Sequence, residues 1–507
     1  MIQRIVCIKQ QTKYTLLTSL LGGVICHLYV MVGHYPAYSG LNLFINNCSV
    51  QITEGRWLAS ILMSLDGNVT LPWVIGLISI IGYAFSNTIL IDILQVKKTS
   101  SNICICLLMI SFPVLASKYY YLYMADVYAA SLLFALLGVW FWNTLTKENY
   151  IKNASISVMF FFFSLSCYQA DMSYALVLMI GIILYKLWNS SKKEFSLYLL
   201  SFLIIMTVSF FVYGAFFKLY QYIIGINSYR NIVVNVDSLI QGVKSSYCAF
   251  IWFYTQCFWS KPVGRVLLVA TVTVIILCYS KIIIMGNYIS RTMIVKSLLS
   301  VVMIMMLPIF LDYTYIVSPY EPYVCRLFGA HVFLVLLPIM LQERKYSNGD
   351  FIFSKKINNL VYVCSITMIW FFFVLDNTAY MNQHLQYEKD YSLAVRIVCQ
   401  IESTEGYRPG MEVVIIQNDG YNVYENDYTK GILTDYLPGM DQRGNAIMST
   451  SYGIKKFIEE FVYADININS NVACGEIDDS ILTELEPFPS SNDIYIDDDK
   501  LYFLLTK

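Results

Sequence analysis

The chain has 507 residues, of which 57% are hydrophobic and only 14% are charged, and its formal net charge at pH 7 is −1. Soluble globular proteins carry about 25% charged residues, so this composition predicts a polytopic membrane protein and excludes a soluble enzyme of this length. The near-zero net charge argues against nucleic acid as a partner. The 13 cysteines lie mostly in apolar runs and form no CxxC or zinc-binding spacing.

Eleven apolar segments approach the length of about 20 residues that a helix needs to cross a bilayer. We expect spans at residues 14–33, 70–94, 102–117, 127–145, 153–168, 172–188, 196–218, 263–280, 295–311, 324–342 and 358–375. The first run is longer than the apolar core of a signal peptide and no A-x-A site follows it, so we expect it to stay uncleaved. Residues 168–171, Tyr-Gln-Ala-Asp, interrupt a long apolar run and predict a tight turn at the membrane surface.

The distribution of lysine and arginine predicts the orientation. Loops on the side of the N-terminus carry about twice as many of these residues as the loops on the other side, as the pairs at Lys97 and Lys98 and at Lys192 and Lys193 illustrate. We therefore place the chain in the cytoplasmic (inner) cell membrane as a multi-pass protein. Its N-terminus is expected inside and, after eleven spans, its C-terminus outside.

The composition changes after Asp376. Residues 377–507 contain 9 basic and 22 acidic side chains, counted along the sequence. A helical pattern at 385–401, a buried strand at 411–417, an amphipathic helix at 452–463 and a hairpin at 493–505 predict a folded α/β unit. We therefore predict an α-helical polytopic membrane domain over residues 1–376, with about eleven transmembrane helices, and a small extracytoplasmic α/β domain over residues 377–507.

Ionisable side chains gather at the predicted outer ends of the spans and are nearly absent from the helix centres. Because charges inside a bilayer are costly, this placement indicates a site at the outer interface and not an ion pathway at mid-membrane. The first outer loop contains Glu54 and Arg56, and Asp126 and Arg326 begin later helices. Each also has a purely structural interpretation. Glu54 can be an ordinary loop carboxylate and Arg56 a snorkelling arginine, while Asp126 can stabilise its helix dipole and Arg326 can anchor its helix at the headgroups.

Motifs for cofactor chemistry are missing from the sequence. The four histidines have no HExxH or other metal-binding spacing, and no Walker A, GxGxxG or GxSxG motif occurs in a suitable context. We predict no cofactor, with a divalent metal ion left open. Any substrate is expected to be reached from the outer leaflet.

Several segments, taken in order, resemble one family. They are GRWLASIL at 55–62, LPWVIGLISII at 71–81, YMADVYAASLLFALLGVW at 123–140, LSCYQADMSYAL at 165–176, and the tail segment at 387–416 that ends in GMEVVII. Together they resemble the serotype-converting, type II glucosyltransferases. These are GT-C-like integral membrane enzymes that decorate O-antigen or other cell-surface polymers.

The resemblance implies a polyprenyl-phosphate sugar donor, with glucose as the sugar, and a cell-surface polysaccharide acceptor. It also implies contact with membrane lipid, and a separate polyprenyl-phosphate glucosyltransferase and flippase that supply the donor. The family is expected to carry an Asn-His-Asp-Gly-like segment early in the first outer loop. Here residues 37–40 read Ala-Tyr-Ser-Gly, so Ser39 replaces the expected aspartate. Either Glu54 or Asp126 takes its role, or this member is altered or inactive.

The residue inventory suits such a transfer. A carboxylate can accept the proton of the acceptor hydroxyl, and arginine binds a leaving phosphate through paired hydrogen bonds. We therefore predict Glu54 or Asp126 as the catalytic base. The donor phosphate is expected to bind Arg56 and Arg326, and the donor sugar is expected to lie near Tyr168 and Gln169. Inverting and retaining chemistry both stay open. The alternatives are a flippase for polysaccharide or lipid-linked sugar, and a degenerate member kept for binding or assembly.

Overall fold

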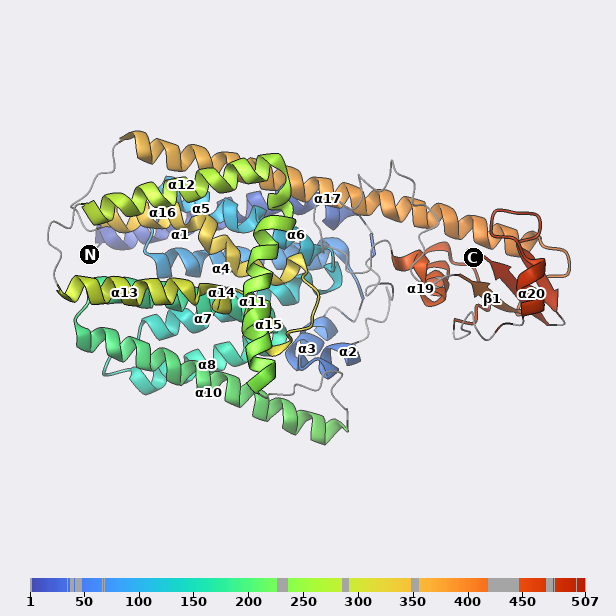
Figure 1. Cartoon of the computed structure of the whole chain (residues 1–507), viewed down its shortest axis with the longest axis horizontal. Helices are drawn as coiled ribbons and strands as arrows, with labels where there is room; N and C mark the ends of the chain where they lie inside the picture. Colours follow the sequence, from blue (N-terminus) through green and yellow to red (C-terminus); the bar gives the residue numbers. More distant parts are fainter. Residues whose placement is uncertain are drawn as a thin grey trace. The chain divides into compact units, whose positions relative to one another are not determined.

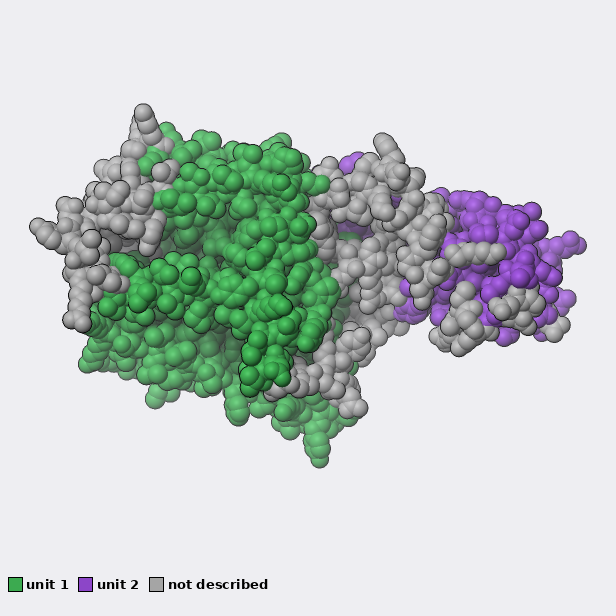
Figure 2. Space-filling view, in the orientation of Figure 1, with its two compact units in different colours: residues 1–32, 47–377, 437–440 green, residues 33–46, 378–436, 441–507 purple. Residues whose placement is uncertain are grey.

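The computed structural model describes residues 2–33, 35–36, 41, 48–65, 67, 69–225, 236–284, 291–347, 355–417, 446–470, 477, 479–497 and 499–506. Ser39 and its neighbours at 37–40 therefore lie outside the described residues. The described residues form mainly helices, with one small sheet near the C-terminal end (Figure 1). It divides into two compact units (Figure 2): residues 1–32, 47–377 and 437–440 form unit 1, and residues 33–46, 378–436 and 441–507 form unit 2.

Unit 1 is helical throughout its described part. Its α-helices are α1 (Ile2–Val32), α2 (Cys48–Thr53), α3 (Trp57–Leu65), α4 (Pro72–Leu94), α5 (Thr99–Ser111), α6 (Pro113–Tyr119), α7 (Ala125–Asn143), α8 (Tyr150–Cys167), α9 (Met172–Asn189), α10 (Lys192–Ile224), α11 (Val236–Gln256), α12 (Pro262–Ile284), α13 (Arg291–Met305), α14 (Leu307–Leu311), α15 (Thr314–Val317) and α16 (Val332–Ser347). Short 3-10 turns connect some of them: η2 (Leu122–Met124), η3 (Gln169–Asp171), η4 (Phe258–Ser260), η5 (Cys325–Leu327) and η6 (Gly329–His331).

Each of the eleven predicted spans contains a helix. Among the described residues, seven helices are long and apolar enough to cross a membrane, or eight if the α5–α6 pair counts as one span. Three shorter apolar helices, at Pro262–Ile276, Val295–Met305 and Gly329–Glu343, account for the remaining predicted segments. The chain is thus a helical membrane protein, and the number of eleven spans stays a prediction.

Local chemistry explains two features of the bundle. Pro113 at the start of α6 has no N–H to continue α5, and the two helices meet there with a bend of 42°. Gly82 on α4 lies against α7, where an added Cβ would come within 2.9 Å of the Ala129 side chain. Small residues at such positions allow helices to pack closely inside a membrane bundle.

Helix α11 was not predicted as a span, and Figure 1 shows it running across the direction of α12 and α13. Its side chains contact two later segments of the chain, one at Asp312 and one at His331. Ser246 Oγ donates to the carbonyl oxygen of Asp312 at 3.2 Å, and the Tyr254 hydroxyl lies 3.2 Å from Nδ1 of His331. His331 Nε2 in turn lies 3.1 Å from Asp312 Oδ1, with both side chains almost fully buried. This network ties the α14–α15 segment to the segment that precedes α16.

Helix α17 (Lys355–Ser403) is one continuous helix of 49 residues. The sequence predicted a span at 358–375 and a separate tail helix at 385–401, and that separation is wrong. No glycine or proline occurs between Lys355 and Ser403, so nothing in the backbone chemistry ends the helix earlier. The division between the two units falls within it, after Asn377.

Unit 2 contains the three strands of the described chain. Its elements after α17 are β1 (Glu412–Ile416), η7 (Ala446–Ser449), α19 (Ser451–Phe457), the π-turn η8 (Ile458–Val462), α20 (Asp479–Glu484), β2 (Ile494–Asp497) and β3 (Lys500–Leu504). The sheet order is β1-β3-β2, with β1 parallel and β2 antiparallel to β3. The predicted strand and hairpin are both present. Buried side chains of α17, the strands and α19 form one hydrophobic cluster, which includes Ile397, Val413, Phe457 and Phe503.

Replacing Phe503 by alanine should loosen this sheet. The ring is completely buried in the cluster, and truncating a buried phenylalanine typically costs about 3–5 kcal/mol. We expect faster hydrogen–deuterium exchange of the β1 and β3 amides in the full-length variant, measured by mass spectrometry. The matched control is Lys500→Ala on the same strand, whose side chain is half exposed. Equal exchange in the two variants would contradict the assigned core.

Candidate functional site

The turn between α2 and α3 consists of Glu54, Gly55 and Arg56. Gly55 has a φ of +82°, a left-handed conformation that costs residues with a side chain roughly 1–2 kcal/mol. An added Cβ on Gly55 would also lie 2.5 Å from the hydroxyl oxygen of Tyr213 on α10. Backbone and available space therefore both require glycine here, and the turn sets a carboxylate and a guanidinium on either side of it.

Arg56 is the most connected side chain of the turn. Its guanidinium forms an ion pair with Glu54 at 2.7 Å, donates to Gln51 Oε1 at 3.3 Å and donates through Nε to Gln169 Oε1 at 3.0 Å. Its Cζ lies 4.9 Å from the ring centroid of Tyr168. Burial alone would lower the pKa of this guanidinium, but the Glu54 carboxylate and the nearby tyrosines raise it above its ordinary value. Arg56 therefore stays charged.

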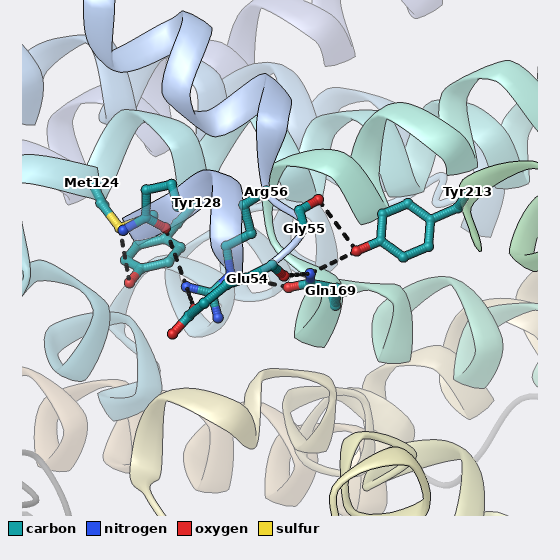
Figure 3. Close-up of polar contacts among 8 residues, drawn as sticks. Glu54, Gly55, Arg56, Met124, Tyr128, Gln169 and Tyr213 are labelled. Atoms are coloured by element: carbon teal, nitrogen blue, oxygen red, sulfur yellow. Dashed lines mark hydrogen bonds and ion pairs between the residues drawn. The ribbon is translucent and has the colours of Figure 1, made fainter. Parts of the chain in front are cut away.

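Gln169 joins the turn to two distant helical segments. Its Nε2 donates to the backbone oxygen of Glu54 and to the hydroxyl of Tyr213, each at 2.8 Å. The Tyr213 hydroxyl donates to the carbonyl of Gly55 at 3.3 Å, and the Tyr313 hydroxyl donates to the carbonyl of Gln169. Figure 3 shows the turn, Gln169 and Tyr213 converging on one point. The amide of Gln169 thus uses its donor and acceptor groups together.

Arg326, in η5, is a second guanidinium close to Tyr168. Its Nη1 donates to the Tyr121 hydroxyl at 3.0 Å, and its Cζ lies 4.6 Å from the centroid of that ring. Burial alone would lower the pKa of Arg326, but Tyr168 and Tyr121 raise it above its ordinary value. The positive charge of Arg326 acts in the opposite direction on Arg56 and lowers the pKa of that guanidinium. Within the described part of the chain, Arg326 forms no ion pair.

The six predicted site residues are thus distributed as follows. Glu54, Arg56 and Gln169 contact one another directly, and Tyr168 links Arg56 to Arg326. Asp126 is partly buried in the first turn of α7. Two residues further along α7, the ring of Tyr128 packs on that of Tyr168, with centroids 4.7 Å apart.

The turn predicted at 168–171 is present between the candidate spans of α8 and α9, and its place at the membrane surface stays a prediction. Its side chains are nevertheless buried within the protein, because Tyr168 is 2% exposed and Asp171 is 1% exposed. The physical reason is an ion pair between Asp171 and Lys118, which is equally buried. Because the carboxylate of Asp171 is paired with an ammonium group, it can be buried, and the turn that carries it is buried as well.

Sequence reasoning also missed several contributors. Tyr121 lies in the tyrosine-rich run at 119–123, which is a signal that could have been used. Gln51, Tyr213 and Tyr313 each occur singly in loops or apolar segments, and no pattern distinguishes them from packing residues. Tyr213 and Tyr313 act through contacts with Gly55 and Gln169, each more than 100 residues away. Gln51 contacts Arg56, which is only five residues away.

The described residues contain no group of three or more histidine, cysteine, aspartate or glutamate side chains that could hold a metal ion. The cluster instead offers guanidinium groups, tyrosine hydroxyls, an amide and a carboxylate. Such groups bind anions and polar hydroxyl-rich molecules through hydrogen bonds, and the carboxylate can accept a proton.

Fold and site together define a helical membrane protein with a polar, arginine-containing cluster built from loops and helix ends. A family model described as "Glucosyl transferase GtrII" matches residues 41–342, which is more than half of the 507 residues. The chain therefore belongs to the GtrII glucosyl transferase family. The matched range includes all six predicted site residues. No curated protein and no solved structure matches the chain.

Replacing Gly55 by alanine should destabilise the turn through both the backbone and Tyr213. We expect a lower melting temperature of the purified chain in detergent, corresponding to roughly 1–3 kcal/mol for the strained backbone. Gly67→Ala is the matched control, because Gly67 has a similar φ of +73° but no atom within 4 Å of its would-be Cβ. Gly55→Ala should also cost less in a Tyr213→Phe background, where the clashing oxygen is absent. Equal costs at the two glycines would show that Tyr213 does not restrict the turn.

Proposed function

We propose that this protein transfers a sugar, glucose, from a polyprenyl-phosphate donor to a cell-surface polysaccharide at the outer face of the cytoplasmic membrane. The family match supports glucosyl transfer. The observation that carries the proposal for this chain is the pair of guanidinium groups at Tyr168. Arg56 is paired with the carboxylate of Glu54, and Arg326 has no ion-pair partner among the described residues. The cluster is therefore suited to an anion.

In the proposed reaction, Arg56 and Arg326 bind the phosphate of the donor. The oxygen of the acceptor hydroxyl forms a bond to the anomeric carbon of the sugar, and the bond from that carbon to the phosphate oxygen breaks. The polyprenyl phosphate leaves with the electron pair, and the guanidinium groups stabilise its negative charge. The hydroxyl proton passes to a carboxylate, Glu54 or Asp126.

Glu54 suits the role of base because of its partner. In the structure its carboxylate is paired with Arg56 at 2.7 Å. A donor phosphate that binds Arg56 competes for this guanidinium and frees the carboxylate to accept a proton. In the proposed reaction Tyr168 and Gln169, which contact Arg56, lie near the sugar. Asp126 is the alternative base, in the first turn of α7.

Removing the base should slow transfer strongly. We expect Glu54→Gln to lower the rate about 10²- to 10⁴-fold, the usual contribution of a positioned general base. The assay measures labelled glucose passing from polyprenyl-phosphate glucose to polymer in membranes. If Asp126 is the base instead, Asp126→Asn shows this loss and Glu54→Gln does not. Asp237→Asn, at an exposed carboxylate on α11, is the control. Wild-type rates in both test variants would refute a carboxylate base at this site.

Removing either arginine should weaken the use of the donor. We expect Arg56→Ala and Arg326→Ala to lower kcat/KM for polyprenyl-phosphate glucose about 10²- to 10³-fold, as observed when one transition-state donor is lost. Lysine at position 56 should restore only part of the rate, because it lacks the planar pair of donors. Arg408→Ala, at an exposed arginine of unit 2, should leave the rate unchanged. Unchanged kcat/KM in both arginine variants would contradict the phosphate assignment.

A further inference from the structure

A buried ion pair lies directly behind the candidate site. Lys118 on α6 and Asp171 at the end of η3 form it, and their side chains are 1% and 2% exposed. The Lys118 ammonium also lies 5.5–5.6 Å from the ring centroids of Tyr128, Tyr168 and Tyr174. Such pairs contribute little net stability, because the loss of hydration offsets the attraction between the charges. Stability alone is therefore a weak explanation for placing two charges here.

The pair is connected to the site through a very short piece of backbone. Gln169 and Asp171 are the two ends of the three-residue turn η3, and Tyr168 immediately precedes it. Fixing the Asp171 side chain therefore fixes the backbone that carries the other two. Arg56 depends on both of them, because its Nε donates to Gln169 at 3.0 Å and its guanidinium lies over the Tyr168 ring.

Lys118 reaches the same two residues from another direction. It holds the η3 backbone through Asp171 and lies within cation–π distance of the Tyr168 ring that Arg56 also contacts. A cation near a ring face restricts where that ring can lie. The position of Arg56 therefore depends on the buried ammonium group of Lys118, which does not contact Arg56 directly.

We propose that Lys118 and Asp171 are positioning residues, which hold Tyr168 and Gln169, and through them the Arg56 guanidinium, in the geometry that the transfer reaction needs. This inference rests on the proposed function. In this proposal, neither Lys118 nor Asp171 touches the substrate. Misplacing a catalytic group by about 1 Å can lower a rate about 10²-fold, so a loss of this anchor is expected to act on kcat.

The test separates positioning from stability by removing both charges together. Lys118→Met leaves Asp171 buried without its partner and should be unstable. The double variant Lys118→Met/Asp171→Leu replaces the pair with apolar side chains, a change that often restores stability. A purely structural pair predicts that transfer recovers with stability in the double variant. Positioning predicts a folded double variant whose kcat, per folded protein, stays about 10²-fold low while KM for the acceptor changes little.

A second readout does not depend on the reaction. Hydrogen–deuterium exchange at residues 51–57 should be faster in the double variant than in the wild type, because the turn loses its support from Gln169. If the wild-type chain shows no transfer, the proposed function fails, and the exchange result still decides whether the pair positions the turn. Wild-type exchange and wild-type kcat in the folded double variant would overturn the proposal.

Two further variants complete the design. Lys186→Met/Glu194→Leu removes a different ion pair, between α9 and α10, which is partly exposed and makes no contact with the site residues. It should leave kcat and the exchange of residues 51–57 unchanged. If the Lys118→Met/Asp171→Leu variant is not recovered folded, Asp171→Asn removes the charge with almost no change of shape. The same two readouts then decide, with slower transfer and faster exchange expected, and wild-type values overturning the proposal.

Discussion

The ring of Tyr168 is the point at which three cationic side chains meet. Arg56 and Lys118 lie within 4.9 and 5.6 Å of its centroid, and Arg326 interacts with its hydroxyl. Moving a charged group out of water costs free energy. The face of an aromatic ring attracts a cation and offsets part of that cost without adding a negative charge. The cluster can therefore bury cations and still keep a net positive potential. Three segments far apart in the sequence are brought together by this one requirement.

The remaining helices support this arrangement from two directions. Lys118 and Asp171 hold the η3 turn from behind, and the network of α11 with Asp312 and His331 holds the segments that deliver Tyr313 and Arg326. The charged side chains of the first network and the Asp312–His331 pair of the second are almost fully buried. A site formed by short turns, which have little structure of their own, thereby acquires the rigidity that positioning a reacting group demands.

The sequence predicted the helical class, the positions of most helices and the strands of unit 2, because apolar length and periodicity are local properties. It also placed Glu54, Arg56, Arg326, Tyr168 and Gln169 in one candidate site. It did not reveal the buried pair of Lys118 and Asp171, since each residue taken alone looks like a charge at a helix end. That pair depends on a contact between distant segments, which residue spacing does not encode. Helix α11 was missed for a different reason: its buried positions recur at helical spacing, but small or polar residues such as Gly242, Ser245 and Ser246 occupy most of them, so no apolar span stands out.

The amide of Gln169 places a chemical limit on this site. It donates to the Glu54 carbonyl and the Tyr213 hydroxyl while it accepts from Arg56. Conversion to glutamate, by deamidation or by a single codon change, would keep the shape and lose both donors. The new carboxylate would face the Glu54 carbonyl oxygen and compete with the Glu54 side chain for the same guanidinium. An almost isosteric change at this position would thus cancel the excess positive charge of the cluster.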